Sequence, residues 1–340
     1  MQVTEERFPD GFLIVPNLEY FFGEFRNEEN CLDIVETFSF QNVAEIHLAR
    51  LGAIAFRFLD GGPLQSIPRY RTSGSGIVPD HVMENHDRIV ELQGRRLIFA
   101  NFIAAALFGR LSAMRHSSLS GAQYVGMAEI LGFERSGREL RIEQSWHSDD
   151  AITPKVRLAR GKPTHIKIAT PDEIAGMVEF VAHLSERQTE FEHADLQTCM
   201  VMNYQAAILH NEQHSAASLA LNFSVAEALI QEIFFAYGIV GDRTPNQFAT
   251  RNHSVPEISR NQFSRLNLER KIAALSDGGL IEPYLGQRLN EARILRNHLM
   301  HRAAVVTVVQ SGNMQTTVRD LWSYLIDGPF ELATAWSMRL

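Results

Sequence analysis

A short segment near the C-terminus combines three side chains that could do acid–base chemistry on a phosphate. Arg296 and Asn297 are adjacent, and His301 follows after three further residues. A guanidinium can bind a phosphate through two parallel hydrogen bonds and neutralise the charge that develops on it. An imidazole can take up or release a proton near neutral pH. The pattern therefore predicts a site that binds a phosphate and moves a proton.

Residues 283–304 are predicted to form the single helix that carries these side chains. Its apolar positions fall on one side at about 100° per residue, and they are Leu285, Leu289, Ala292, Leu295, Leu299, Met300 and Ala303. Arg296 projects near the centre of this stripe, and burying an unpaired guanidinium would cost several kcal/mol. Arg296 therefore needs an anionic partner from the protein or from a ligand. Asn297 and His301 are one turn apart and can act together, and His301 lies about 140° round from Arg296, so the three side chains are expected to share one edge of the helix.

An arginine, a polar residue, three further residues and a histidine on a late helix resemble the signature of the HEPN superfamily. Residue by residue, Arg296, Asn297 and His301 match its arginine, polar position and histidine. The resemblance covers about residues 200–330 and none of the N-terminal half. It implies a metal-independent ribonuclease that is formed when two helical domains dimerise and bring two motifs together.

The resemblance also implies how such a site would work. RNA carries its own nucleophile in the 2′-hydroxyl, so neither a metal nor another cofactor is expected. His301 would transfer a proton, Arg296 would bind the scissile phosphate, and Asn297 would orient His301 or bond the phosphate. Acid and base catalysis together need two groups, which a two-fold dimer would supply. The alternative source of the second group is His298 or a residue of the N-terminal domain.

Further polar residues could extend this site. Basic side chains that could contact RNA on the same helix are Arg288, Arg293, His298 and Arg302, although a solvated charged face gives the same pattern. Asn222 and Glu227, on a predicted helix 215–237, could support the motif. In the structural alternative, Arg296 is salt-bridged to Glu227 or Glu291 within the bundle, and His301 is an ordinary surface residue near a helix C-terminus.

Other patterns carry weaker signals. His210 and His214 have a metal-ligand spacing but lack an obvious third ligand, so we expect structural histidines, no metal site and no metallohydrolase. Residues 146–150 place His147 beside two carboxylates, which is typical of a polar loop as well. Residues 74–76 are too short a glycine-rich segment to cradle a phosphate, and the neighbouring Arg69, Tyr70 and Arg71 are expected in a loop over residues 69–79.

The composition limits the class of protein. The chain has 340 residues, 45% of them hydrophobic and 21% charged, with a net charge of −8. This charge argues against a protein that coats nucleic acid by bulk electrostatics. Cys31 and Cys199 are far apart, the N-terminus is acidic and not apolar, and the apolar run 97–108 is too short to span a bilayer. We expect a cytoplasmic protein without a disulfide framework and without a membrane segment.

The chain is expected to contain a mixed α+β domain over residues 1–195 and an all-α, HEPN-like helical bundle over residues 196–340. The strands predicted in the first are 12–15, 53–58, 140–143 and 165–168, with a helix over 87–114. Thr170, Pro171 and Glu173 form an N-terminal capping pattern for a helix that extends to about residue 194. The helices predicted beyond it are 200–210, 215–237, 261–275, 283–304 and 316–326, with a loop over 242–258 and a break at 311–313.

These features lead to one functional hypothesis and one alternative. The first is a dimeric endoribonuclease of a defence or toxin type that cleaves RNA without a metal. The N-terminal domain would sense a signal or restrain the nuclease, and its own partner is not indicated. The alternative is a non-catalytic helical module that binds nucleotide, RNA or a partner protein.

Overall fold

A computed structural model describes most of the chain and divides it into two compact units. The first unit comprises residues 1–107 and 121–182, and the second comprises residues 108–120 and 183–340. The described residues are 2–7, 10–17, 19–23, 31–73, 77–115, 122–126, 129–142, 167–188, 195–237 and 259–326. A sheet-containing N-terminal region thus precedes a mostly helical C-terminal part, as predicted. The division differs from a boundary at residue 195, because the long helix α1 (Asp80–Met114) contributes its last turns to the second unit.

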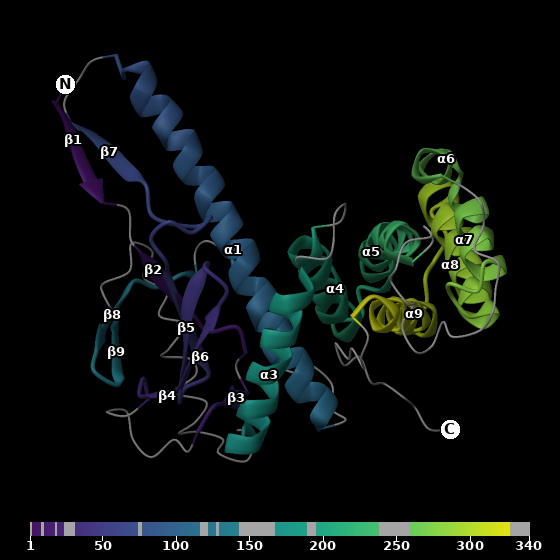
Figure 1. Cartoon of the computed structure of the whole chain (residues 1–340), viewed down its shortest axis with the longest axis horizontal. Helices are drawn as coiled ribbons and strands as arrows, with labels where there is room; N and C mark the ends of the chain where they lie inside the picture. The colour runs from purple at the N-terminus through teal and green to yellow at the C-terminus, as the bar shows by residue number, and fades with distance from the viewer. Residues whose placement is uncertain are drawn as a thin grey trace. The chain divides into compact units, whose positions relative to one another are not determined.

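The first unit is built around a four-stranded antiparallel sheet with the order β2–β6–β5–β4 (Figure 1). Its strands are β2 (Gly11–Ile14), β4 (Ile34–Phe40), β5 (Ala44–Ala49) and β6 (Ala53–Phe58). Strands β5 and β6 are almost continuously buried, which shows that both faces of the sheet are covered. The strands predicted over 12–15 and 53–58 are confirmed.

Aromatic side chains join one face of this sheet to α1. The ring of Phe99 on α1 lies 5.3 Å from that of Phe40 and 5.9 Å from that of Phe56, in edge-to-face arrangements. Phe102, one turn further along, contacts Phe40 at 5.6 Å. Edge-to-face pairs add to the free energy gained by burying such large rings. This cluster explains why α1 is apolar in the part that crosses the sheet.

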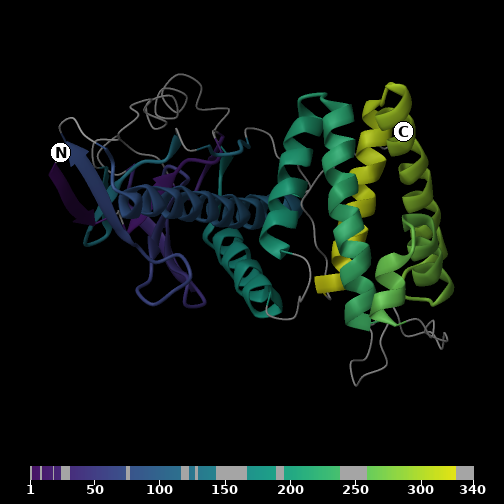
Figure 2. The same cartoon turned by 90° about the horizontal axis from the view of Figure 1, so that it is seen from above.

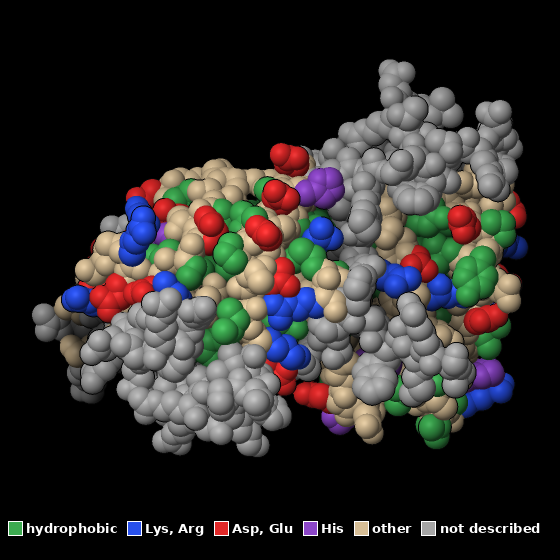
Figure 3. Space-filling view, turned by 90° about the horizontal axis from the view of Figure 1, so that it is seen from below, with side chains coloured by type: hydrophobic (Ala, Val, Ile, Leu, Met, Phe, Trp, Pro, Cys, Tyr) green, Lys and Arg blue, Asp and Glu red, His purple; other side chains and the backbone are tan. Residues whose placement is uncertain are grey.

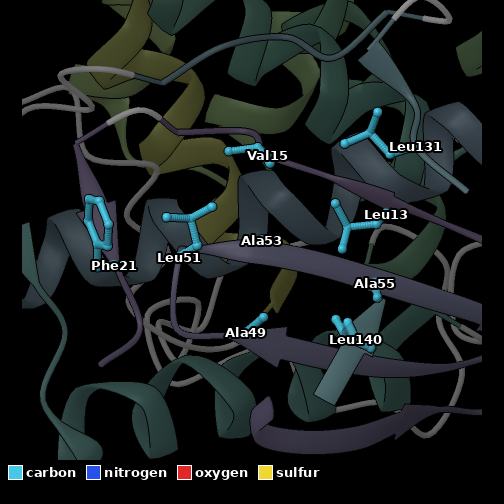
Figure 4. Close-up of a cluster of buried hydrophobic side chains, with 9 residues drawn as sticks. All are labelled: Leu13, Val15, Phe21, Ala49, Leu51, Ala53, Ala55, Leu131 and Leu140. Carbon is cyan, nitrogen blue, oxygen red and sulfur yellow. The ribbon is translucent and has the colours of Figure 1, made fainter. Parts of the chain in front are cut away.

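The other face of the sheet buries smaller side chains (Figure 4). Leu13 and Ala55 lie on neighbouring strands and pack with Leu131 and Leu140 from outside the sheet. The alternation of Phe12, Leu13 and Ile14 places successive side chains on opposite faces, as the two-residue period of a strand requires. The two faces together form the core of the first unit.

Strands outside this sheet also belong to the first unit, and one of them corrects a prediction. Residues 69–79 were expected to form a loop, but β7 (Pro68–Ser73) pairs antiparallel with β1 (Gln2–Arg7). The pairing partner is more than 60 residues away in the chain, so local turn signals could not reveal it. The others are the hairpin β8 (Phe133–Ser136) with β9 (Glu139–Ile142), and β3 (Tyr20–Phe21) paired parallel with β10 (Lys167–Ile168).

Helices α3 (Pro171–Gln188) and α1 contribute residues to both units. The predicted cap of α3 is confirmed, because the Thr170 hydroxyl accepts from the Glu173 amide and the Glu173 carboxylate accepts from the Thr170 amide at 2.7 Å. Helix α1 begins earlier than the predicted residue 87. The patterns over 74–76, 146–150 and 242–258, and the predicted end of α3 near residue 194, lie outside the described residues.

The second unit is a helical bundle arranged around α5 (Ser215–Tyr237). Helix α5 contacts α4 (Leu196–Asn211), α7 (Leu268–Asp277), α8 (Pro283–Arg302) and α9 (Val308–Ile326). Figures 1 and 2 show these helices side by side. The sequence of α5 is apolar on nearly all sides, which is typical of the central helix of a bundle, and this is where the structure places it.

Two helix boundaries differ from the predictions. The helix expected over 261–275 is divided into α6 (Arg260–Arg265) and α7, because the Asn267 side chain accepts from the Arg270 amide and caps a new helix. The break expected at 311–313 is absent, since α9 continues through Ser311 and Gly312. A Cβ on Gly312 would lie 3.3 Å from the His210 ring, so a small residue serves close packing against α4 here.

Three buried amides connect α4, α5 and α9 inside the bundle. The Asn203 Nδ2 donates to Asn222 Oδ1 at 2.7 Å, and the Asn222 Nδ2 donates to Gln315 Oε1. The three side chains are 0–2% exposed. Because buried polar groups need partners, this chain of bonds restricts α5 to one rotation and one register against its neighbours.

Helices α1 and α5 are long and apolar enough to cross a membrane by length and composition. However, 83% and 67% of their most apolar windows are buried within the protein. The core helix of a folded domain meets the same criteria.

We predict that Asn222→Ala destabilises the second unit. The substitution leaves the Asn203 amide and the Gln315 carbonyl without this partner, at about 1–3 kcal/mol for each buried group. Thermal unfolding of the full chain, followed by circular dichroism, should show a lower Tm. Ser224→Ala, at an exposed position of the same helix, should change Tm little. An unchanged Tm in Asn222→Ala would show that the amide chain contributes nothing to stability.

Candidate functional site

The predicted motif lies on α8, which begins with Pro283 and ends at Arg302. Proline is suited to the first helical position because its missing N–H has no intrahelical acceptor there. At the other end, Ala303 adopts a left-handed conformation with φ of 49°, and its N–H donates to the Leu299 carbonyl. This left-handed cap turns the chain away immediately after the motif. The predicted helix over 283–304 is therefore confirmed to within two residues.

The predicted apolar stripe of α8 is buried only in its first half. Leu285, Leu289 and Ala292 are buried, where α8 packs against α7 and α5. In the second half, Leu295 and Leu299 are half-buried and Met300 is 60% exposed. The predicted stripe is therefore enclosed only along the first half of α8, because packing against neighbouring helices does not cover its last turns. The motif occupies this partly exposed half.

Arg296 is half-buried and rests on an aromatic ring of the central helix. Its Cζ lies 5.6 Å from the centroid of the Phe223 ring on α5, and its Nη1 donates to Asn297 Oδ1 at 3.3 Å. No carboxylate among the described residues lies within 4.0 Å of the guanidinium. An ion pair to Glu227 or Glu291, as in the structural alternative, is therefore absent from the described part of the chain. The charge of Arg296 is held in place by a neutral ring and a neutral amide.

The histidine of the motif faces solvent. His301 is exposed, as are its neighbours His298 and Arg302. In the regions that the structure describes, the His301 side chain forms no hydrogen bond or ion pair, and the Asn297 side chain bonds Arg296 and not His301. Arg296 and His301 are five positions apart on the helix, and the two side chains diverge by about 140°. A single helix therefore presents them on different sides, which corrects the expectation that they share one edge.

The other basic residues expected to contact RNA differ in their surroundings. Arg288 Nη1 bonds Asp320 on α9 at 2.8 Å, and Arg293 Nη2 bonds Glu269 on α7 at 3.1 Å. Both arginines therefore connect α8 to a neighbouring helix, and their contact with RNA stays a prediction. Arg302 and His298 are exposed near the end of α8 and remain accessible to a ligand.

The two residues proposed to support the motif also occupy different positions. Asn222 bonds Asn203 and Gln315, so it does not reach Arg296. It nevertheless precedes Phe223, whose ring contacts Arg296. Glu227 is exposed, one turn further along α5. Phe223 was not predicted as part of the site. The sequence does hold a signal for it, because Phe223 follows the polar Asn222 on the central helix, and adjacent helical residues face different neighbouring helices.

Histidines His210 and His214 do not form a metal site with other described residues. Among these residues no group of three or more potential ligands could hold a metal ion. His210 is buried, and its Nδ1 lies 3.1 Å from the Ser311 hydroxyl on α9. Burial lowers the pKa of His210, because the charged imidazolium is poorly solvated there. The structure thus gives His210 a packing role, in agreement with the expectation of a structural histidine.

Comparisons with known proteins give no relative for this chain. No protein-family model matches its sequence, and the searches of curated proteins and of solved structures returned no match.

We predict that His210 makes the stability of the second unit dependent on pH. Its pKa in the folded state is below the 6.5 of an ordinary histidine, so the unfolded chain binds the proton more tightly. The stabilising contribution is present above pH 6.5 and is lost as the pH falls below that value. Between about pH 7.5 and about pH 5.5, wild type should lose more unfolding free energy in urea than His210→Gln. Equal losses in the two proteins would contradict the assignment of this pH dependence to His210. His47, which is buried in the first unit, is present in both proteins, so its contribution is the same in each.

Proposed function

We propose that the second unit is a HEPN-like domain and that the protein is a metal-independent endoribonuclease. The observation that carries this proposal is the surroundings of Arg296. Its guanidinium is positioned by Phe223 and Asn297, but no carboxylate of the described residues neutralises it. A positioned and uncompensated cation is suited to an anionic ligand, and a phosphate accepts two bonds from a guanidinium. The exposed His301, on the same two turns of helix, supplies a proton-transfer group.

The reaction would proceed by attack of the RNA 2′-hydroxyl on the adjacent phosphorus. A base removes the hydroxyl proton, a P–O bond forms, and the bond to the 5′-oxygen breaks as an acid protonates that oxygen. The products are a 2′,3′-cyclic phosphate and a 5′-hydroxyl. Arg296 would stabilise the negative charge on the phosphorane, and His301 would serve as either the base or the acid.

The divergence of Arg296 and His301 supports a homodimer as the active form. Two motifs related by a two-fold axis would provide two histidines and two arginines, and a side chain of one copy could complete the site of the other. Exposed apolar side chains lie close to His301 in the sequence, at the end of α8, in the connection to α9 and in the first turn of α9. Met300 is 60% exposed, Val305 87% and Val309 71%. Apolar exposure of this kind is typical of a surface that a second protein covers.

The proposal requires a local cationic site and not a basic surface. The net charge is −8. On the face drawn in Figure 3, acidic and basic side chains are interspersed over the described residues. Affinity for RNA would therefore come from a few contacts near the motif, including Arg302 and His298. A role in defence or toxicity, with the first unit as sensor or restraint, follows from the HEPN resemblance.

The alternative is a non-catalytic module of the same type that binds nucleotide, RNA or a partner protein. One observation favours it, namely that His301 has no hydrogen-bond partner among the described residues to orient its ring. In such a module Arg296 would still bind a phosphate, while His301 would be dispensable.

We predict that His301→Ala reduces cleavage of RNA by about 100-fold or more, the usual effect of removing an acid–base group. The assay uses the full chain in EDTA, with detection of 2′,3′-cyclic phosphate ends. His214→Ala, at another exposed histidine of the second unit, should retain activity. Equal cleavage by wild type and His301→Ala would remove His301 from the mechanism. If wild type binds RNA and does not cleave it, the alternative is supported.

A further prediction concerns Phe223 as a positioning residue for Arg296. Phe223→Leu should weaken binding of a non-cleavable 2′-O-methyl RNA by about two- to fivefold or more, since a cation–π contact contributes about 0.5–1 kcal/mol when exposed and more when it is shielded from solvent. In an Arg296→Ala background the same substitution should have no further effect, because its influence acts through the guanidinium. An equal loss in both backgrounds would show that Phe223 acts only through the stability of the bundle.

A further inference from the structure

A cavity of about 380 Å³ lies between α5, α8 and α9 in the second unit. Four apolar side chains line it, and they are Leu219 of α5, Ala292 and Leu295 of α8, and Met314 of α9. Its volume is at the lower end of the range for small-molecule sites. The cavity is therefore large enough for one small planar molecule, and of these four side chains Leu295 is the one that is not buried.

The charges around the cavity disfavour an anion. Arg288 lines it, but Nη1 bonds Asp320 Oδ2 at 2.8 Å and Nη2 bonds the Asn313 carbonyl at 2.8 Å. Asp320 thus neutralises this guanidinium. The carboxylate of Glu291 also lines the cavity and would repel a phosphate. A neutral ligand suits this lining better than a charged one.

Amide side chains provide hydrogen-bonding groups at the edge of the cavity. Gln287 Nε2 donates to Glu291 at 2.9 Å, and Gln310 Oε1 accepts from the Thr307 amide at 2.9 Å. The Oε1 of Gln287 and the Nε2 of Gln310 remain able to bond a ligand. Such paired donors and acceptors are what proteins use to recognise the edges of nucleobases.

An aromatic side chain completes this lining. Tyr284 lines the cavity and is 65% exposed, and the Arg288 Cζ lies 5.5 Å from its ring centroid. A large exposed ring that is already held by a fixed guanidinium offers a preorganised surface for stacking. Nucleobases stack on such rings irrespective of their sequence.

We propose that this cavity binds a nucleobase, with Tyr284 stacking on the base and the amides bonding its edge. The choice of an RNA strand as the source of the base rests on the proposed function. Leu295 of the cavity immediately precedes Arg296, whereas Tyr284 lies about 18 Å from Arg296 along the helix axis. A base stacked on Tyr284 would thus belong to the same strand as the phosphate at Arg296, but to a nucleotide further along it. A free nucleoside has the same chemistry and is the other source.

The test compares two non-cleavable 2′-O-methyl oligonucleotides of equal length, one with bases and one abasic, for binding to the full chain by fluorescence anisotropy. Wild type should bind the base-bearing strand about tenfold more tightly, within the range for base–aromatic stacking. Tyr284→Leu should abolish this difference, and Tyr284→Phe, which keeps the ring, should retain it. Ile294→Ala, exposed on the same helix but outside the cavity, is the matched control. Thermal unfolding checks that each variant is folded.

Titration with the four free nucleosides distinguishes the two sources. Nucleoside binding that depends on Tyr284, without discrimination between the two strands, would identify a free nucleoside as the ligand. The inference is overturned if wild type neither discriminates between the strands nor binds nucleosides more tightly than Tyr284→Leu does. His301→Ala should keep the discrimination between strands, because the oligonucleotides cannot be cleaved. Failure of the proposed nuclease function would therefore be seen in the cleavage assay, and failure of the base site would be seen in the binding assay with non-cleavable strands.

Discussion

The structure of the second unit depends on how α5 is rotated within the bundle. Its buried Asn222 bonds Asn203 on one neighbouring helix and Gln315 on another, and both bonds can form in only one arrangement. A rotation of α5 would leave several buried amides without partners, which is energetically costly. With this rotation, the adjacent Phe223 faces α8 and supports Arg296, while Leu219 lines the cavity between α8 and α9. The buried amide contacts of α5 thus determine both which side chain supports Arg296 and which side chain of α5 lines the cavity.

The arginines of α8 illustrate how surroundings distinguish residues of the same type. Arg288 and Arg293 are both bonded to carboxylates on neighbouring helices, so their charges contribute to packing of the bundle. Arg296 instead contacts a ring and an amide, neither of which neutralises it. Because a guanidinium stays protonated at any physiological pH, its charge persists whether or not a partner is present. An anionic ligand is the partner that these surroundings favour for Arg296.

The geometry of α8 also bears on why the proposed enzyme would be a dimer. Two residues five positions apart on a straight helix diverge, so one copy cannot direct both Arg296 and His301 at one phosphate from the same side. The exposed apolar side chains close to His301 in the chain, Met300, Val305 and Val309, are ones that a second copy could cover. The neighbouring cavity, with a mixed apolar and polar lining and a neutralised arginine, differs in chemistry from the motif. The two sites together would hold a base and a phosphate of one strand.

The sequence by itself determined the elements whose signals are local. The central position of α5, the limits of α8 and the cap at Thr170 follow from apolar periodicity, proline placement and side chains that satisfy free amides. The identity of Arg296, Asn297 and His301 as a motif likewise follows from residue types and spacing, and its ribonuclease function remains a proposal. Only the tertiary structure decided the continuation of α9 through Gly312, the pairing of β7 with β1, and the partners of each arginine. These features depend on contacts between residues far apart in the chain. Their energies come from packing and from charge neutralisation in three dimensions, which local propensity does not record.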